Sequence, residues 1–330
     1  MSHDILLEQL RSAEAVVRRY FPPTPVVSAP RLSAALGAAV DFKLEICTPI
    51  RVFKLRGALV KLDALARAGV TGGVATASAG NHGLAVARAA RLFGRSALVC
   101  VPEGANPQKI ALIEAEGARV EQRGRDYQAA FEHCVDLAQA EGRTIVHAYD
   151  DPDVISGQGT VVLELLAGAE YDAVVLGIGG GGLISGVGAA IKQWRPETRV
   201  IGVEPEGADS MARSLAAGQI TALERVQTIA DGLAARHPGE WTFDLARRYV
   251  DEVWTVSDEQ ILDGLAFLLR EERQVVEPAG GAAVAGLLAR GAAAAAPRVQ
   301  GRAPRLAVVL SGANIADVVL AEVLRRAAGA

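Results

Sequence analysis

The sequence predicts an α/β fold in which parallel sheets are covered by helices on both faces. Short, continuously apolar runs alternate with amphipathic stretches along most of the 330 residues. Continuous apolar runs, rather than runs that alternate with polar residues, are typical of strands buried on both faces of a sheet. The chain is longer than a typical single domain, which indicates two domains or one large α/β unit.

The predicted elements follow one another as strands and helices of ordinary length. A charged, helix-like segment opens the chain at residues 1–20, and an apolar helical stretch follows Lys54. Strands are predicted at residues 73–77, 96–101, 118–121, 172–178, 199–203 and 305–310. Helices are predicted at residues 83–93, 106–116, 127–141 and 184–194. The alanine-rich segment 291–304 is interpreted as a helix end followed by a surface connection.

The composition argues against several classes of partner. A net charge of −4 and 5% aromatic residues offer neither a basic surface nor stacking platforms for nucleic acid. The N-terminus lacks the apolar core of a signal peptide, and no apolar run approaches the about 20 residues of a membrane span. The cysteines Cys47, Cys100 and Cys134 are far apart, as expected of reduced thiols. We therefore expect a cytoplasmic protein with a small-molecule ligand, and no nucleic-acid or membrane partner.

A strand, a glycine turn and a helix at residues 171–194 form the most informative local feature. The turn holds four consecutive glycines at positions 179–182. Because glycine has no Cβ atom, the backbone can curl around an anion and direct several N–H groups at phosphate oxygens. The following helix presents its N-terminus to the same anion. The turn is therefore interpreted as a phosphate site.

The same turn also fits a dinucleotide fingerprint. Gly177, Gly179 and Gly182 match GxGxxG, and Glu204 ends the next strand at about the spacing of a ribose-binding acid. This pattern is weak by itself, because glycine turns and strand-terminal acids are common in α/β proteins. A nicotinamide oxidoreductase therefore stays open on these residues alone.

Three further polar segments are candidates for chemistry. Lys54 lies in FKLRGA, and a lysine amine kept near neutrality forms Schiff bases with aldehydes. SAGNHG at 78–83 opens a helix, where hydroxyl, amide and backbone N–H groups suit a carboxylate. SGAN at 311–314 directly follows a strand, on the rim where α/β sheets bind ligands. Each segment also has a structural interpretation: a solvated lysine, a helix N-cap and a turn.

In this order, the four segments resemble the threonine/serine dehydratase branch of the fold-type II pyridoxal-phosphate enzymes, which is also serine racemase-like. The resemblance runs from TPVVSAPRLS, which begins at residue 24, to SGANI at 311–315. Further matching segments are KLE at 43–45, ISGQGT at 155–160, TIADGL at 228–233 and VEPAGGAA at 276–283. The resemblance implies pyridoxal 5′-phosphate as the cofactor in place of a nicotinamide. It also implies a tryptophan synthase β-like fold with two three-layer domains, each built on a parallel sheet.

The resemblance implies roles for named residues. Lys54 would hold the cofactor as a Schiff base and later move protons, with Phe53 against the pyridine ring. Asn81 would hydrogen-bond the 3′-oxygen, and Ser311 would meet the ring nitrogen. A serine there makes the ring a weaker electron sink, which suits loss of a β-leaving group. The phosphate would be held by Gly179, Gly180, Gly181, Gly182 and Leu183. The substrate carboxylate would be held by Ser78, Gly80, Asn81 and His82.

The implied activity is removal of water and ammonia from a small L-β-hydroxy amino acid, of the threonine or serine type, to leave a 2-oxo acid. The alternatives are a dehydratase of another such amino acid, for example 3-hydroxyaspartate, and a serine racemase with side elimination activity. Many relatives have Gly-Ser where this chain has Arg51 and Val52, so Arg51 is either a surface residue or a cation for an acidic substrate. Ala79 replaces the second serine of the racemases, so we expect little racemisation. A non-enzymatic amino-acid-binding module and a nicotinamide oxidoreductase are the competing classes.

The resemblance also bears on metal binding and domains. EPEGADS at 204–210 resembles a loop that binds a divalent cation, Mg²⁺ or Ca²⁺, through Glu204 and the Ala208 carbonyl. Ser210 stands where another carboxylate is often found, so the metal assignment stays undecided. We expect a large cofactor-binding domain of residues 1–66 and 149–330, and a small mobile domain of residues 67–148 that closes over the cofactor. A homodimer or homotetramer is expected.

Overall fold

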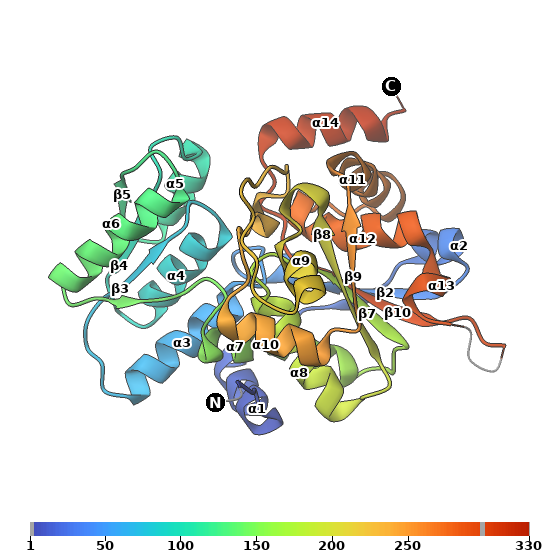
Figure 1. Cartoon of the computed structure of the whole chain (residues 1–330), viewed down its shortest axis with the longest axis horizontal. Coiled ribbons are helices and arrows are strands. Elements are labelled where there is room, and N and C mark those ends of the chain that lie inside the picture. The colour runs from blue at the N-terminus through green and yellow to red at the C-terminus, as the bar shows by residue number, and fades with distance from the viewer. Residues whose placement is uncertain (1–2, 298–300, 330) are drawn as a thin grey trace.

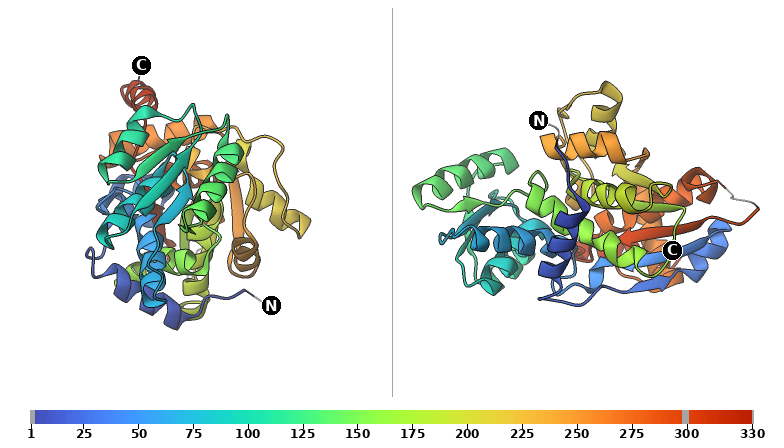
Figure 2. Two further views of the ribbon diagram at one scale, coloured as in Figure 1. Left: turned by 90° about the vertical axis from the view of Figure 1, so that its left-hand side faces the viewer. Right: turned by 90° about the horizontal axis from the view of Figure 1, so that it is seen from below.

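The fold is built on two sheets that lie side by side, as Figure 1 shows, with helices around each. The structure is a computed structural model and describes residues 3–297 and 301–329. The six-stranded sheet has the order β1-β2-β10-β7-β8-β9, and the four-stranded sheet has the order β5-β4-β3-β6. In the left view of Figure 2 the smaller sheet and its helices face the viewer.

The large sheet is parallel except at one edge. Its strands are β1 (Val26–Ser28), β2 (Ala39–Leu44), β7 (Ala173–Gly177), β8 (Arg199–Pro205), β9 (Glu252–Val256) and β10 (Arg305–Leu310). β1 pairs with β2 in the antiparallel sense, whereas β2, β10, β7, β8 and β9 run parallel to their neighbours. The prediction of parallel sheets is therefore corrected at β1, a three-residue edge strand with only one strand neighbour.

The small sheet is parallel throughout. Its strands are β3 (Val74–Ala77), β4 (Ala97–Val101), β5 (Arg119–Gln122) and β6 (Thr144–Ile145). The strands predicted from apolar runs are all present, with bounds within one or two residues of those expected. β1, β2, β6 and β9 lie outside those predictions, because their apolar runs are short or contain charged residues.

The helices begin and end where the chain supplies suitable caps. Asp151 accepts N–H bonds from residues 153 and 154 ahead of Pro152, and Ser257 with Gln260 forms a capping box. The helices are α1 (Leu7–Val17), α2 (Pro30–Leu36), α3 (Leu55–Arg67), α4 (Asn81–Leu92), α5 (Pro107–Ala115), α6 (Tyr127–Ala140), α7 (Pro152–Leu166), α8 (Gly182–Trp194), α9 (Ser210–Ala217), α10 (Glu240–Tyr249), α11 (Asp258–Glu272), α12 (Pro278–Arg290), α13 (Ala292–Ala295) and α14 (Asp317–Ala327). α12 ends directly before the alanine-rich segment 291–304, α13 lies near the start of that segment, and residues 298–300 lie outside the described residues.

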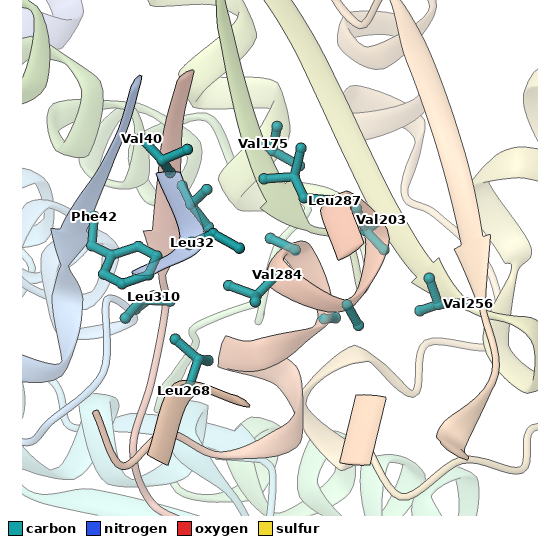
Figure 3. Close-up of a cluster of buried hydrophobic side chains, with 14 of the residues drawn as sticks. Leu32, Val40, Phe42, Val175, Val203, Val256, Leu268, Val284, Leu287 and Leu310 are labelled. Atoms are coloured by element: carbon teal, nitrogen blue, oxygen red, sulfur yellow. The ribbon is translucent and has the colours of Figure 1, made fainter. Parts of the chain in front are cut away.

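The largest core cluster fills the space between one face of the large sheet and the helices over it. Figure 3 shows Val175, Val203 and Leu310 from the strands packed towards Val284 and Leu287 of α12. All five side chains are fully buried. Burial of such side chains stabilises a fold by about 1.5–3 kcal/mol each, so this layer holds the sheet rigid beneath the site. Among the described residues, no helix is both long and apolar enough to span a bilayer.

Candidate functional site

The sequence-predicted clusters come from the carboxyl ends of three parallel strands. The SAGNHG segment follows β3, the glycine turn follows β7, and the SGAN segment follows β10. Ligands of α/β sheets bind at this edge, because loops and helix N-termini converge there. The fold therefore places segments that are far apart in the sequence on the ligand-binding edges of its two sheets.

Lys54 lies directly before α3 with its amine end enclosed by protein. Its Nζ donates a hydrogen bond to the Ala148 carbonyl oxygen at 2.9 Å and lies 5.4 Å from the centre of the Phe53 ring. Burial lowers the pKa of Lys54 to about 8, and the nearby Glu277 carboxylate opposes this shift. At pH 7 roughly a tenth of such an amine is uncharged, against less than about one in a thousand for a solvated lysine. The amine is therefore a competent nucleophile and base.

The residues before Lys54 are tied to the end of β10. The Phe53 N–H donates to the Ser311 carbonyl oxygen at 3.0 Å, and the Ala313 N–H donates to the Arg51 carbonyl oxygen at 2.9 Å. The Ser311 hydroxyl is buried and makes one long contact, 3.4 Å, to the Ala279 carbonyl oxygen. Such a weak bond leaves the hydroxyl able to meet another polar atom.

The glycine turn is enclosed by side chains on two sides. Gly181 has φ +96°, a left-handed conformation that a side chain disfavours, and α8 begins at the next residue. A Cβ atom on Gly180 would lie 2.2 Å from the Tyr149 ring, and one on Gly181 would lie 2.7 Å from Met211. The Gly180 carbonyl oxygen accepts a bond from the Thr242 hydroxyl at 2.7 Å. The turn is thus held in place with its backbone N–H groups at a helix N-terminus.

The SAGNHG segment begins α4 with a short turn. The Ser78 N–H donates to the Cys100 carbonyl oxygen at 3.1 Å, and the Gly80 N–H donates to the Ser78 hydroxyl at 3.2 Å. The helix then starts at Asn81, where the first N–H groups have no intrahelical acceptor. Ala79 packs its methyl group against an apolar cluster and brings no hydroxyl to the site.

His82 is buried, and one nitrogen of its ring is free to accept a hydrogen bond. Its Nε2 lies 3.0 Å from the Val146 carbonyl oxygen, which only accepts, so Nε2 carries the proton. Burial and the charge of Lys54 lower the pKa of His82 to about 3, which keeps the ring neutral. Nδ1 therefore presents a lone pair and has no partner among the described residues. A carboxylate would be met by the backbone N–H of His82 rather than by its side chain.

Sequence analysis did not assign Glu277 and Asn314, which contact Asn81. The Asn81 amide donates to Glu277 at 2.6 Å and accepts from the Asn314 amide at 2.8 Å. Burial raises the pKa of Glu277 to about 7. Glu277 lies inside the family-like segment 276–283 and Asn314 inside 311–315. Membership of these segments is the sequence feature that could have identified both residues.

Tyr149 was also missed, although it borders the glycine turn. Its ring lies against Gly180, its backbone and Cβ atom lie near Gly182, and its hydroxyl donates to the His237 carbonyl oxygen at 3.2 Å. The next residue, Asp150, accepts N–H bonds from the start of α10 at 2.9–3.3 Å. No local pattern marks these two residues, because their partners lie far along the chain.

The stretch at 204–210 runs from the end of β8 to the start of α9. The buried Glu204 carboxylate accepts N–H bonds from Met211 and Ala212, at 2.9 and 2.8 Å, and so caps α9. Burial raises the pKa of Glu204 to about 8. Within residues 3–297 and 301–329, no group of three His, Cys, Asp or Glu side chains could hold a metal. Each oxygen of the carboxylate accepts one of these bonds, which fixes Glu204 at the start of α9.

Arg51 has an unusual backbone conformation at the edge of this site. Its φ is +61°, in the left-handed region where most residues other than glycine are disfavoured, and its side chain is exposed. No ion pair of Arg51 occurs among the described residues. The guanidinium is therefore not committed to a structural partner.

Comparison with known proteins places these features in one family. The family model described as pyridoxal-phosphate dependent enzyme matches residues 17–312. The L-threonine ammonia-lyase of Thermotoga maritima is 38% identical over 312 residues, which cover 94% of this chain and 76% of the relative. The serine racemase of Schizosaccharomyces pombe is 34% identical, covering 96% of this chain and 97% of the relative.

A solved structure extends the similarity to the whole fold. The structure of maize serine racemase superimposes with a TM-score of 0.89 at 33% identity, covering 100% of this chain and 99% of that one. The similarity therefore includes both sheets and the segments between them.

Proposed function

The chain belongs to the family of pyridoxal-phosphate-dependent enzymes, and we propose that it removes water and ammonia from a small L-β-hydroxy amino acid of the threonine or serine type. It is a lyase that uses pyridoxal 5′-phosphate. The observation that carries the substrate proposal is the enclosed Lys54 amine, with a pKa of about 8, beside a helix N-terminus suited to a carboxylate.

The residues fit this cofactor. The glycine turn, closed by Tyr149 on one side and by Met211 and Thr242 on the other, has room for backbone N–H contacts but none for side chains. With the N-terminus of α8, this turn would hold the phosphate. Lys54 would bind the aldehyde carbon, and the Ser311 hydroxyl would meet the ring nitrogen. When bound, pyridoxal phosphate supplies an aldehyde for amines and an electron sink that weakens the bonds at the substrate Cα.

The protein itself would bind the substrate carboxylate and transfer the protons. The free N–H groups at the start of α4, with the Ser78 hydroxyl, would bind the substrate carboxylate. Lys54 as a neutral amine would take the Cα proton, and as an ammonium it would supply a proton to the departing β-hydroxyl. The Ala148 carbonyl oxygen accepts from this amine at 2.9 Å and holds it in place.

A serine racemase is the second candidate, because serine racemases are among the similar proteins. Racemisation needs a proton donor on the face of the substrate opposite Lys54, and here the position carries Ala79. We therefore expect elimination to exceed racemisation clearly. Formation of D-serine from L-serine at a rate equal to pyruvate formation would favour the racemase instead.

The substrate class can be tested through Arg51. We expect the protein to release a 2-oxo acid and ammonia from L-threonine or L-serine. If Arg51 recognises a second carboxylate, Arg51→Ala should lower kcat/KM for 3-hydroxyaspartate by about tenfold or more, while threonine and serine change little. The measurement is 2-oxo acid released from all three amino acids by both proteins. Unchanged relative preferences would assign Arg51 to the surface.

The glycine turn offers a second test. Gly180→Ala should weaken pyridoxal phosphate binding by about tenfold or more, because the new methyl group would clash with the Tyr149 ring at 2.2 Å. Gly168→Ala is the matched control, since its nearest neighbour would be 3.9 Å away. Titration of the cofactor-free proteins with pyridoxal phosphate measures both affinities. Equal affinities in the two variants would contradict the role of the turn.

The proposal includes the domain organisation and the assembly. Residues 67–148 would move as a small domain relative to residues 1–66 and 149–330, and the chain would form a homodimer or homotetramer in the cytoplasm. Light scattering after size-exclusion chromatography measures the assembly, and an elution at the monomer mass would contradict it.

A further inference from the structure

A buried carboxylate contacts the helix that carries the substrate-binding segment. Glu277, which directly precedes α12, is 3% exposed, and its Oε1 accepts a hydrogen bond from Asn81 Nδ2 at 2.6 Å. Asn81 begins α4, which packs on the small sheet, whereas α12 packs on the large sheet. This hydrogen bond therefore joins the two halves of the site.

The neighbouring groups determine which end of the Asn81 amide is the nitrogen. The Asn314 Nδ2 lies 3.2 Å from the Ile50 carbonyl oxygen, which only accepts, so Asn314 must turn its NH₂ group that way. The same NH₂ group also donates to Asn81 at 2.8 Å, so the accepting atom of Asn81 must be Oδ1. The Nδ2 of Asn81 then faces Glu277, and its second hydrogen is left for another acceptor.

Gly312 of the SGAN segment leaves space for the Glu277 carboxylate. A Cβ atom at Gly312 would lie 2.2 Å from Glu277 Oε1, so only glycine leaves room for the carboxylate. The Glu277 N–H donates to the Gly312 carbonyl oxygen at 3.0 Å, and the backbone N–H of Asn314 favours the charged form of the Glu277 carboxylate. Glu277, Gly312 and Asn314 thus form one unit around the Asn81 amide.

We propose that Glu277 is a positioning residue for the elimination reaction: with Asn314 it holds the Asn81 amide so that the second Nδ2 hydrogen stays free for the 3′-oxygen of pyridoxal phosphate. The inference rests on the proposed placement of Asn81 at the cofactor. Glu277 acts through Asn81 and does not itself touch the reacting atoms. Asn314 fixes the orientation of the amide, and the ionised Glu277 carboxylate accepts from the nitrogen that this orientation turns towards it.

A double-mutant cycle on the full-length protein tests this inference. The variants are Asn81→Ala, Glu277→Ala and the double replacement, and the measurements are the dissociation constant of pyridoxal phosphate, the wavelength of its bound absorption band, and kcat. Each single replacement should weaken binding by roughly fivefold or more and shift the band. In cofactor affinity and band position the double variant should be no worse than Asn81→Ala, because Glu277 reaches the cofactor through that amide. The non-additivity is not required of kcat, because Glu277 also raises the pKa of Lys54.

Two further variants separate this role from a general loss of a carboxylate. Glu277→Gln keeps an oxygen acceptor and should bind the cofactor within about threefold of the unmodified protein. Glu272→Gln is the matched control: Glu272 accepts a bond from the Leu32 N–H at 2.7 Å away from the site, and its replacement should change neither binding nor the absorption band. If Glu277→Ala fails to fold, Asn314→Ala replaces it in the cycle, with the same expected non-additivity.

The outcomes distinguish this inference from the proposed function. An effect of Asn81→Ala combined with additive losses in the double variant would overturn the inference and leave the proposed function standing. An Asn81→Ala variant with normal cofactor binding would overturn both the inference and the placement of Asn81.

Discussion

Replacing Lys54 with alanine should abolish turnover and the yellow colour of the protein together. The reason is that one amine holds the cofactor and moves the Cα proton. Loss of both functions should lower the rate of 2-oxo acid release by at least about 10⁴-fold. The unmodified protein should show an absorption band that borohydride bleaches, and Lys54→Ala should lack this band. A colourless unmodified protein that fails to take up pyridoxal phosphate would contradict the assignment of Lys54.

Two comparisons make the Lys54 test specific. Lys54→Arg keeps a positive charge but offers no amine that forms a Schiff base, so it should be as inactive as the alanine variant. Lys61→Ala removes another partly buried lysine from the same helix, one that pairs with Asp151 at 2.6 Å and Asp153 at 3.1 Å. This control should keep its colour and most of its activity.

Replacing Arg56 with leucine should cause the largest loss of stability expected from a single change in α3. Arg56 is fully buried, and its guanidinium binds Glu45 at 2.7 and 2.9 Å and Glu164 at 2.8 and 2.9 Å. Lys43 completes the cluster with a bond of 2.6 Å to Glu164. Removing the arginine leaves two buried carboxylates with one lysine, which should lower the free energy of unfolding by about 3–5 kcal/mol.

The Arg56 prediction has a control on the same helix. The exposed Arg67 side chain forms an i,i+4 pair at 2.8 Å with Asp63, which is buried and also pairs with Arg19. Because Asp63 keeps Arg19 as a partner, Arg67→Ala should change the free energy of unfolding by no more than about 1 kcal/mol. Urea unfolding of the cofactor-free proteins measures both values. Equal, small losses in the two variants would show that the buried cluster is not what anchors the start of α3. Because Arg56 lies two residues after Lys54, we also expect Arg56→Leu to disturb the amine.

Much of the fold could be predicted from local patterns. The continuous apolar runs became β3, β4, β5, β7, β8 and β10, because a run of that length between turn residues is a strand wherever it is buried. The amphipathic stretches became α4, α5, α6 and α8 for the same reason. The antiparallel edge strand β1 was not predictable, because a three-residue strand has almost no pattern of its own.

The site was predictable only in part. The family resemblance pointed to Lys54 and to the glycine turn, and the structure places the Lys54 amine where burial lowers its pKa. The four glycines had been interpreted through phosphate binding alone. The structure adds a packing reason, since Tyr149 and Met211 occupy the space that side chains would need. That reason comes from residues distant in the chain.

The sequence by itself determined the alternation of the main strands and helices, the family, and the chemical identity of the groups at the strand ends. These depend on residues that are neighbours along the chain, where periodicity, capping and glycine content act directly. Only the tertiary structure decided that Glu277 faces Asn81, that Glu204 caps α9, and that Arg56 and Glu164 share a buried cluster. The physical reason is that hydrogen bonding and desolvation depend on which distant segments pack together, and no local pattern records that packing.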